Sequence, residues 1–127
     1  MKKVVTSDRA PAVAGPYSPA LVVDGWIFLA GQGGFDPTTG ELAGDDVESQ
    51  TEQAFRNIAA LLEEAGSSLA DIVSCLVHLV DLGDFAGMNV AFERQFPGIK
   101  PVRTTVRADL LSGMRVEVTA IARKAAG

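Results

Sequence analysis

The stretch IVSCLVHLV, residues 72–80, decides the fold because it is apolar at both odd and even positions. Its β-branched residues favour an extended chain, and a strand that is apolar on both faces is typical of a sheet interior. A sheet built around residues 72–80 therefore needs a cover on each face. The single histidine, His78, lies in this strand, where we expect a packed or hydrogen-bonded ring rather than a catalytic one.

Further strands are predicted on both sides of this one. Residues 20–31 (ALVVDGWIFLAG) indicate two strands joined at Asp24-Gly25, a dipeptide suited to a tight hairpin turn. Residues 101–107 (PVRTTVR) and 115–123 (RVEVTAIAR) indicate two more, and residues 2–6 another. We expect the strands at 101–107 and 115–123 to pair antiparallel through the intervening turn.

Two helices interrupt the strands. Apolar residues recur at helical spacing between residues 47 and 65, with Asp45 or Asp46 placed to cap the start. A second helix over residues 85–95 can be capped by Asp84. The order β-β-α-β-α-β-β predicts an α+β structure in which both helices cover one face of the sheet.

The other sheet face has no cover within the chain, so copies of the same protein are the simplest candidate. We therefore predict a homo-oligomer whose sheets pack together. The length of 127 residues suits one domain over residues 1–127. Hydrophobic residues make up 47% and charged residues 21%, as in folded globular proteins.

The charge distribution argues against a nucleic-acid partner but allows a small anion. The net charge is −5, which opposes binding to a polyanion. Residues 100–127 nevertheless hold six Lys or Arg against two acids, whereas residues 1–99 hold five against fourteen. A small anion is therefore best held in the C-terminal part.

The remaining composition indicates a cytoplasmic protein without a metal site. No apolar segment follows the two lysines of the start, and none reaches the length of a membrane span. The single cysteine, Cys75, cannot form an internal disulfide, and we expect it to be a small buried hydrophobic residue. One His and one Cys offer no metal-ligand spacing, and GQGG at residues 31–34 lacks the spacing of a phosphate loop.

Arginines in the strand at residues 101–107 point to a possible site. Alternation places Arg103, Thr105 and Arg107 on one face, which is either solvent or a binding surface. Antiparallel pairing with the strand at 115–123 would bring Glu117 onto the same face as Arg103. Spacing alone favours an ordinary surface ion pair between them.

Five motifs shift this balance, because together they resemble the Rid (YjgF) family of reactive intermediate deaminases. They run in family order from Ala10 to Arg123 and comprise GPYSPA at 15–20, FLAGQ at 28–32, the helix with Asn89, P-x-R-T at 101–104 and VEVTAIA at 116–122. The resemblance implies a chorismate-mutase-like fold with a mixed sheet, two helices on one face, and a homotrimer with sites between subunits. It implies hydrolysis of 2-imino acids and enamines, such as 2-iminopropanoate and 2-iminobutanoate, to 2-oxo acids and ammonia without a cofactor.

The resemblance also assigns roles to residues. Arg103 would bind the substrate carboxylate, and Glu117 would activate water and return a proton to the leaving nitrogen. Tyr17 would close the pocket, and backbone groups at Gly31 and Thr105 would hydrogen-bond the reacting centre. Asn89 would hydrogen-bond near the site or across subunits, or face outward, whereas Arg107 has no role in the motif.

Two departures from the family pattern concern the site. Thr105 stands where many relatives have cysteine, and Ala30 where relatives often have serine. These changes leave open a deaminase of another pathway-specific enamine and a non-catalytic trimer that binds small 2-oxo carboxylates. Some relatives are described as ribonucleases, an activity that the acidic composition disfavours here.

Overall fold

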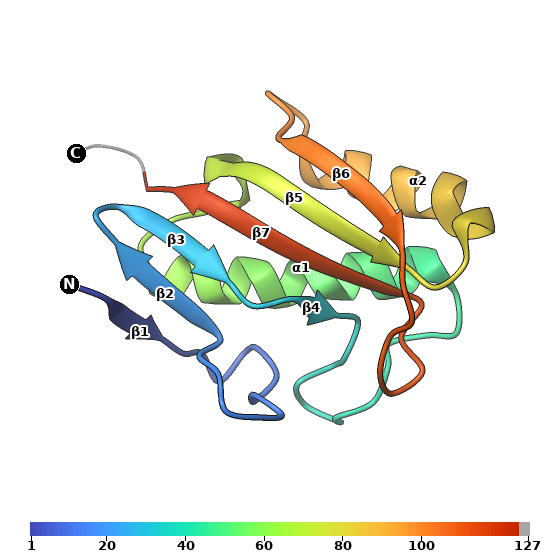
Figure 1. Ribbon diagram of the computed structural model, residues 1–127, viewed down its shortest axis with the longest axis horizontal. Coiled ribbons are helices and arrows are strands. Elements are labelled where there is room, and N and C mark those ends of the chain that lie inside the picture. Colours follow the sequence, from blue (N-terminus) through green and yellow to red (C-terminus); the bar gives the residue numbers. More distant parts are fainter. Residues whose placement is uncertain (125–127) are drawn as a thin grey trace.

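The computed structural model describes residues 1–124, which form one mixed sheet with two helices packed against one face (Figure 1). The strands lie in the order β1-β2-β3-β7-β5-β6, and the short β4 pairs with β7. This arrangement confirms the α+β class and the mixed sheet. The strand bounds are β1 Lys3–Val5, β2 Ala20–Val23, β3 Trp26–Leu29, β4 Gln32–Gly33, β5 Ile72–Leu79, β6 Val102–Arg107 and β7 Val116–Arg123.

The long helix α1 (Val47–Glu64) supplies most of the cover for the sheet. Its N-terminus is capped by Asp46, whose carboxylate accepts a hydrogen bond of 2.9 Å from the backbone N–H of Ser49. Asp46 rather than Asp45 is therefore the cap. The sheet-facing side of α1 is fully buried and includes Phe55, Ile58 and Leu62.

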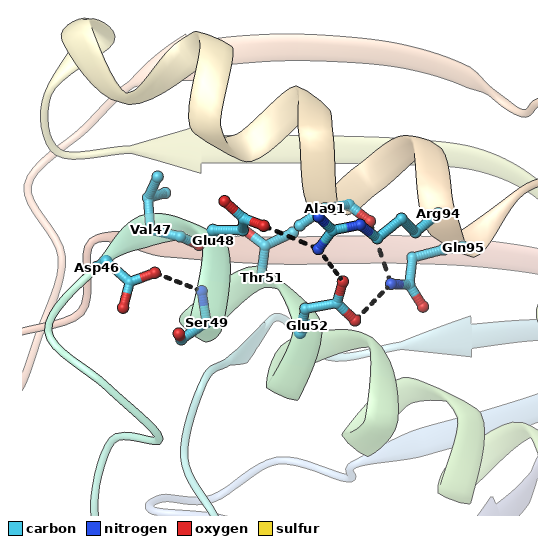
Figure 2. A network of polar contacts seen from close by, with 9 residues as sticks. All are labelled: Asp46, Val47, Glu48, Ser49, Thr51, Glu52, Ala91, Arg94 and Gln95. Atoms are coloured by element: carbon cyan, nitrogen blue, oxygen red, sulfur yellow. Dashed lines mark hydrogen bonds and ion pairs between the residues drawn. The ribbon is translucent and has the colours of Figure 1, made fainter.

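The second helix α2 (Phe85–Gln95) packs beside α1 and is tied to it by polar contacts (Figure 2). Arg94 lies 2.8 Å from a carboxylate oxygen of Glu48 and 3.2 Å from one of Glu52, which also accepts a hydrogen bond from Gln95. These groups are partly exposed, so their main effect is to orient α2 rather than to stabilise the fold strongly.

The pairing of β6 differs from the sequence-based expectation. β6 pairs parallel with β5, and β5 pairs antiparallel with β7 on its other side. Two parallel neighbours need a crossover connection, and α2 provides it between β5 and β6. The expected antiparallel pairing of the strands at 101–107 and 115–123 is therefore wrong, because β5 lies between them.

One local expectation also needs correction, and three short elements were not expected. Asp84 flanks the start of α2 without a capping hydrogen bond from its side chain, and its carboxylate instead lies 3.4 Å from the guanidinium of Arg115. It belongs to a short 3-10 turn, Leu82–Asp84, and a similar turn, Leu69–Asp71, precedes β5. Neither turn was expected from the sequence, nor was β4.

The sheet has one face covered by the helices and one face left open. In β5 the side chains of Cys75, Val77 and Leu79 are buried, whereas those of Leu76 and His78 are only half-buried. A single chain therefore covers one face of β5, and the cover expected for the other face from further copies stays a prediction. We call the uncovered side the open face; it carries the apolar residues Leu21, Val23, Trp26, Phe28, Leu76, Val106 and Ile121.

Within residues 1–124, no helix combines the length and the apolar character needed to cross a membrane. α1 is long enough, but its solvent side carries charged residues such as Arg56 and Glu63.

Candidate active site

The candidate residues lie in two groups on opposite faces of the sheet. Arg103 is the register partner of the buried Cys75, so its side chain lies on the helix side. Glu117 is the register partner of His78, so its side chain lies on the open face. The expectation that Arg103 and Glu117 share a face is wrong, because they pair with residues of β5 that point to opposite faces. We name the two groups the Arg103 cluster (Arg103, Thr105, Asn89) and the Glu117 pocket (Tyr17, Gly31, Glu117).

Residues of α2 form the wall of the Arg103 cluster. The guanidinium carbon of Arg103 lies 4.7 Å from the ring centre of Phe92 and 5.4 Å from that of Phe85. One guanidinium nitrogen lies 3.8 Å from the sulfur of Met88. Aromatic faces attract a cation without neutralising it. Within residues 1–124 Arg103 has no carboxylate partner, so its charge remains available to an anion.

Two further polar side chains of the Arg103 cluster are enclosed but unpaired. The hydroxyl of Thr105 and the side-chain oxygen of Asn89 are buried and have no hydrogen-bond partner among the described residues. Asn89 lies one turn after Phe85 in α2, and Thr105 follows Arg103 by two positions on the same face of β6. Unpaired buried polar atoms are uncommon and indicate a missing partner. Arg107, further along the same face of β6, is exposed.

The thiol beside Arg103 is not a reactive group. Burial raises the pKa of the Cys75 thiol to about 12, and the positive charge of Arg103 opposes this rise only in part. Cys75 is therefore a neutral thiol at physiological pH. This agrees with its expected role as a buried small hydrophobe.

The Glu117 pocket is a cavity of about 180 Å³ at the start of β7. The absence of a side chain at Gly31 makes room for the carboxylate, because a Cβ at this position would lie 2.8 Å from an oxygen of Glu117. Within residues 1–124, no hydrogen bond or ion pair engages that carboxylate. The other walls are mainly apolar and include Val13, Phe35, Leu111 and Met114.

Tyr17 lies at the mouth of this pocket and is half exposed. Its backbone N–H donates to the carbonyl of Gly15 at 2.9 Å, and its hydroxyl accepts a hydrogen bond from the backbone N–H of Ala14 at 3.3 Å. The turn therefore holds the ring over the chain that precedes it. The hydroxyl keeps its own proton free to donate to a bound molecule.

A buried amide fixes the chain on the far side of the pocket. Asn57 of α1 donates hydrogen bonds to the carbonyls of Gly33 and Phe35, at 3.1 and 2.9 Å. Its side-chain oxygen accepts a hydrogen bond from Gln53. α1 thus positions the segment after Gly31 in addition to covering the core.

The sequence did not indicate every residue that shapes these groups. Phe85, Met88 and Phe92 were expected only as the apolar side of a helix, whereas they also form the wall around Arg103. A strand, a helix and a second strand in succession is the usual pattern of a parallel pair, and this pattern could have placed α2 beside β6.

No group of three or more His, Cys, Asp or Glu side chains in residues 1–124 is arranged to hold a metal ion. The chemistry available to the two groups is that of a guanidinium, a hydroxyl, a side-chain amide, a carboxylate, a phenol and backbone amides.

Comparison with known proteins identifies the family. Residues 7–124 match the family model described as Endoribonuclease L-PSP. The chain belongs to the Rid (YjgF) family. The resemblance found in the sequence motifs is thereby confirmed.

Relatives of this Rid-family chain span nearly its whole length. A RutC family protein of Pyrococcus abyssi is 44% identical over 97% of this chain and 98% of its own. The 2-iminobutanoate/2-iminopropanoate deaminase of Mus musculus is 38% identical over 96% of this chain and 91% of its own. The crystal structure of RidA from an Antarctic Psychrobacter superposes with a TM-score of 0.91 at 40% identity, over 95% of this chain and 98% of that one.

Proposed function

We propose that this Rid-family protein hydrolyses reactive 2-imino acids and their enamine tautomers, such as 2-iminopropanoate and 2-iminobutanoate, to 2-oxo acids and ammonia. Relatives with deaminase names at about 37–38% identity support this reading. The observation that carries it is the pair of unengaged ionic groups. Arg103 lacks a carboxylate partner within residues 1–124, and the carboxylate of Glu117 faces an apolar pocket without a partner.

Arg103 provides the part of the site that binds the substrate carboxylate. A guanidinium presents two parallel N–H groups that match the two oxygens of a carboxylate, which lysine does not. The unpaired Thr105 hydroxyl and Asn89 side-chain oxygen lie on the faces of β6 and α2 that flank Arg103. The Thr105 hydroxyl can donate to the substrate carboxylate, whereas the Asn89 oxygen can only accept a hydrogen bond from an N–H of the substrate.

Glu117 provides the acid–base chemistry. Its carboxylate takes a proton from a water molecule whose oxygen attacks C2 of the imine. Glu117 passes this proton to the imine nitrogen, which becomes an amine. Glu117 then takes the proton of the new C2 hydroxyl and returns it to the amine nitrogen as the C–N bond breaks. Ammonia leaves and the 2-oxo acid remains, so one water molecule is consumed. Backbone groups at Gly31 and Thr105 and the hydroxyl of Tyr17 can stabilise the tetrahedral centre.

A complete site requires a second copy of the chain. The Arg103 cluster and the Glu117 pocket lie on opposite faces of the sheet and are separated by β5. One substrate cannot contact both within one chain. The uncovered apolar open face, with Trp26 and Phe28 at 40% and 44% exposure, supports self-association. We propose a homotrimer in which the Arg103 cluster of one copy completes the Glu117 pocket of another.

Turnover of freshly generated imino acids tests this function. 2-Iminopropanoate and 2-iminobutanoate are made in situ by an amino-acid oxidase, and formation of the 2-oxo acid is followed with wild type and Arg103→Ala. We expect acceleration by wild type and a loss of roughly a hundredfold or more in kcat/KM for Arg103→Ala, because a charge-assisted bidentate contact is removed.

Arg107→Ala is the matched control, because Arg107 lies on the same face of the same strand and is exposed. We expect it to retain wild-type turnover. Equal losses in the two variants would reduce the result to a general effect of positive charge on β6. A well-folded wild type without acceleration would contradict the proposed substrates.

Two alternatives predict different outcomes in the same assay. A deaminase of a larger, pathway-specific enamine would accelerate that compound and not the two small imino acids. A non-catalytic protein that binds 2-oxo carboxylates would show no turnover in wild type, and Glu117→Gln would leave its ligand affinity unchanged. An activity on RNA is disfavoured by the net charge of −5.

A further inference from the structure

The guanidinium of Arg103 is held by aromatic rings rather than by a carboxylate. Its carbon lies over the rings of Phe92 and Phe85, at 4.7 and 5.4 Å from the two ring centres. Arg94 and Arg115 instead pair with carboxylates, at nitrogen-to-oxygen distances of 2.8–3.4 Å. A carboxylate partner would occupy the N–H groups that a bound anion needs, whereas the face of a ring attracts the cation and leaves those groups free.

One face of α2 supplies these contacts. Phe85, Met88 and Phe92 are three and four positions apart, so they lie on the same side of the helix. The sulfur of Met88 lies 3.8 Å from a guanidinium nitrogen of Arg103 and is a weak acceptor. Within residues 1–124, no oxygen accepts a hydrogen bond from this guanidinium. Its N–H groups therefore remain available to a ligand.

The ring of Phe92 is itself fixed by the core. It is 5% exposed and packs edge-to-face against the ring of Phe55 in α1, with ring centres 5.4 Å apart. Phe96 adds a second neighbour, with its ring centre 5.0 Å away. A buried ring packed against two others has little freedom to turn, so the surface that meets the guanidinium is in place before a ligand binds.

This support bears on how tightly an anion is bound. A long arginine side chain loses rotamer freedom on binding a ligand, unless the free protein already holds it in the bound orientation. A bidentate contact with a carboxylate also depends on the orientation of the guanidinium plane. The affinity for a carboxylate should therefore depend on the rings as well as on Arg103.

We propose that Phe92 and Phe85 are positioning residues that hold the guanidinium of Arg103 in the orientation that binds the substrate carboxylate. The two rings act through Arg103 and take no part in the acid–base chemistry at Glu117. This inference rests on the proposed function, in which Arg103 binds the carboxylate. It predicts that affinity falls when a ring is removed, even where an apolar side chain replaces it.

KM and kcat together separate this role from general packing. Phe92→Leu keeps an apolar side chain but removes the ring, and it is compared with wild type on 2-iminobutanoate generated in situ. We expect KM to rise about tenfold, because the cation loses its contact with a buried ring. We expect kcat to fall less than about threefold, because Glu117 is untouched.

Phe96→Leu is the matched control. Phe96 is 3% exposed and packs against Phe55 at 5.5 Å, much as Phe92 does, whereas the rings that meet Arg103 are those of Phe92 and Phe85. We expect the two leucine variants to lose similar stability in urea unfolding, and only Phe92→Leu to raise KM. An equal rise in both would overturn the proposal, because it would reflect the packing of the core.

Phe85 provides a second test that does not disturb the core, since its side chain is 43% exposed. Phe85→Leu should raise KM by about threefold, less than Phe92→Leu, because a ring contact near water is weaker. Phe85→Tyr keeps the ring and should retain the KM of wild type. Equal KM values in wild type and Phe85→Leu would overturn the role of Phe85, and this pair decides the proposal if Phe92→Leu does not fold.

Binding of the product 2-oxobutanoate, measured by titration calorimetry, does not depend on turnover. We expect its Kd to rise about tenfold in Phe92→Leu and to stay within about twofold of wild type in Phe96→Leu. An unchanged Kd in Phe92→Leu would overturn the proposal. Light scattering verifies that each variant keeps the assembly size of wild type.

The two measurements distinguish failure of this inference from failure of the proposed function. A wild type that binds 2-oxobutanoate through Phe92 but shows no imine turnover would support the positioning role and contradict the deaminase function. Imine turnover that is lost in Arg103→Ala but unchanged in Phe92→Leu would support the function and overturn the positioning role. A wild type that neither binds 2-oxobutanoate nor hydrolyses imines would contradict both.

Discussion

The buried polar side chains of α1 differ in their hydrogen bonding from those around β5, β6 and α2. On α1, four buried polar side chains all have hydrogen-bond partners within the chain: Gln50, Thr51, Gln53 and Asn57. Around β5, β6 and α2, three side chains have a buried polar atom without a hydrogen-bond partner: His78, Asn89 and Thr105. The first group makes its hydrogen bonds within a single copy, whereas the second lacks hydrogen-bond partners in a single copy.

The difference separates the part of the molecule that builds the fold from the part that is available for function. A satisfied buried group stabilises one conformation, whereas an unsatisfied one costs free energy until something binds it. The unsatisfied atoms belong to or adjoin the candidate site. The same contrast holds for the two faces of the sheet, because the helix side is packed and the open face is apolar and uncovered.

The largest effect is expected from a charge on the open face. Phe28→Asp places a carboxylate at the centre of this face, where association would bury it without a partner. We expect self-association to weaken by more than about a hundredfold, with loss of any activity that needs two copies. Light scattering over a range of protein concentrations measures the association.

Val90→Asp provides the comparison, because Val90 is exposed to a similar degree, 45% against 44% for Phe28, but lies on α2. We expect this variant to associate like wild type. A Phe28→Asp protein with an unchanged assembly size would show that the open face is not the interface. The open face would then not be the side of the sheet that is available for association.

An intermediate effect is expected from two asparagines on opposite sides of the comparison. Asn57→Ala leaves the carbonyls of Gly33 and Phe35 unpaired and should lower the free energy of unfolding by about 2–3 kcal/mol. Asn89→Ala removes a side-chain oxygen that has no partner and should cost less than about 1 kcal/mol. Urea unfolding of both variants measures these changes.

If Asn89 lies near the bound substrate, Asn89→Ala should weaken substrate binding more than Asn57→Ala does. A large stability loss in Asn89→Ala would mean that its side chain already contributes to the fold. The division between satisfied and unsatisfied groups would then not match the division between fold and site.

The helices were predictable from the sequence because their signals are local. Asp46 precedes an apolar periodicity that continues through α1, and the bounds of α2 coincide with the expected residues 85–95. Capping and helical spacing depend on residues only a few positions apart. The cap at Asp84 was expected for the same reason, but Arg115 from a distant part of the chain engages its carboxylate instead.

The site was only partly predictable because it depends on strand pairing. The sequence placed Arg103 and Thr105 correctly on one face of β6, since alternation is a local property. It could not show that β6 and β7 both pair with β5, in registers that put Arg103 and Glu117 on opposite faces. Family motifs brought both residues to attention, but the geometry that divides them between two faces comes from the structure.

The smallest effect is expected at the N-cap of α1, a satisfied contact at the surface. The backbone N–H of Ser49 donates to Asp46 and lowers the pKa of that carboxyl below its ordinary value of 3.8. A lowered pKa stabilises the folded state above pH 3.8, and the stabilisation is lost as the pH falls through the lower folded-state value. Asp46→Ala should therefore lower Tm by a few degrees at most at pH 7, and the difference from wild type should disappear in acid.

Asp45→Ala, which removes the neighbouring acid without touching the cap, should leave Tm unchanged. Equal shifts in the two variants would indicate a general effect of negative charge at the start of α1 rather than a hydrogen-bonded cap.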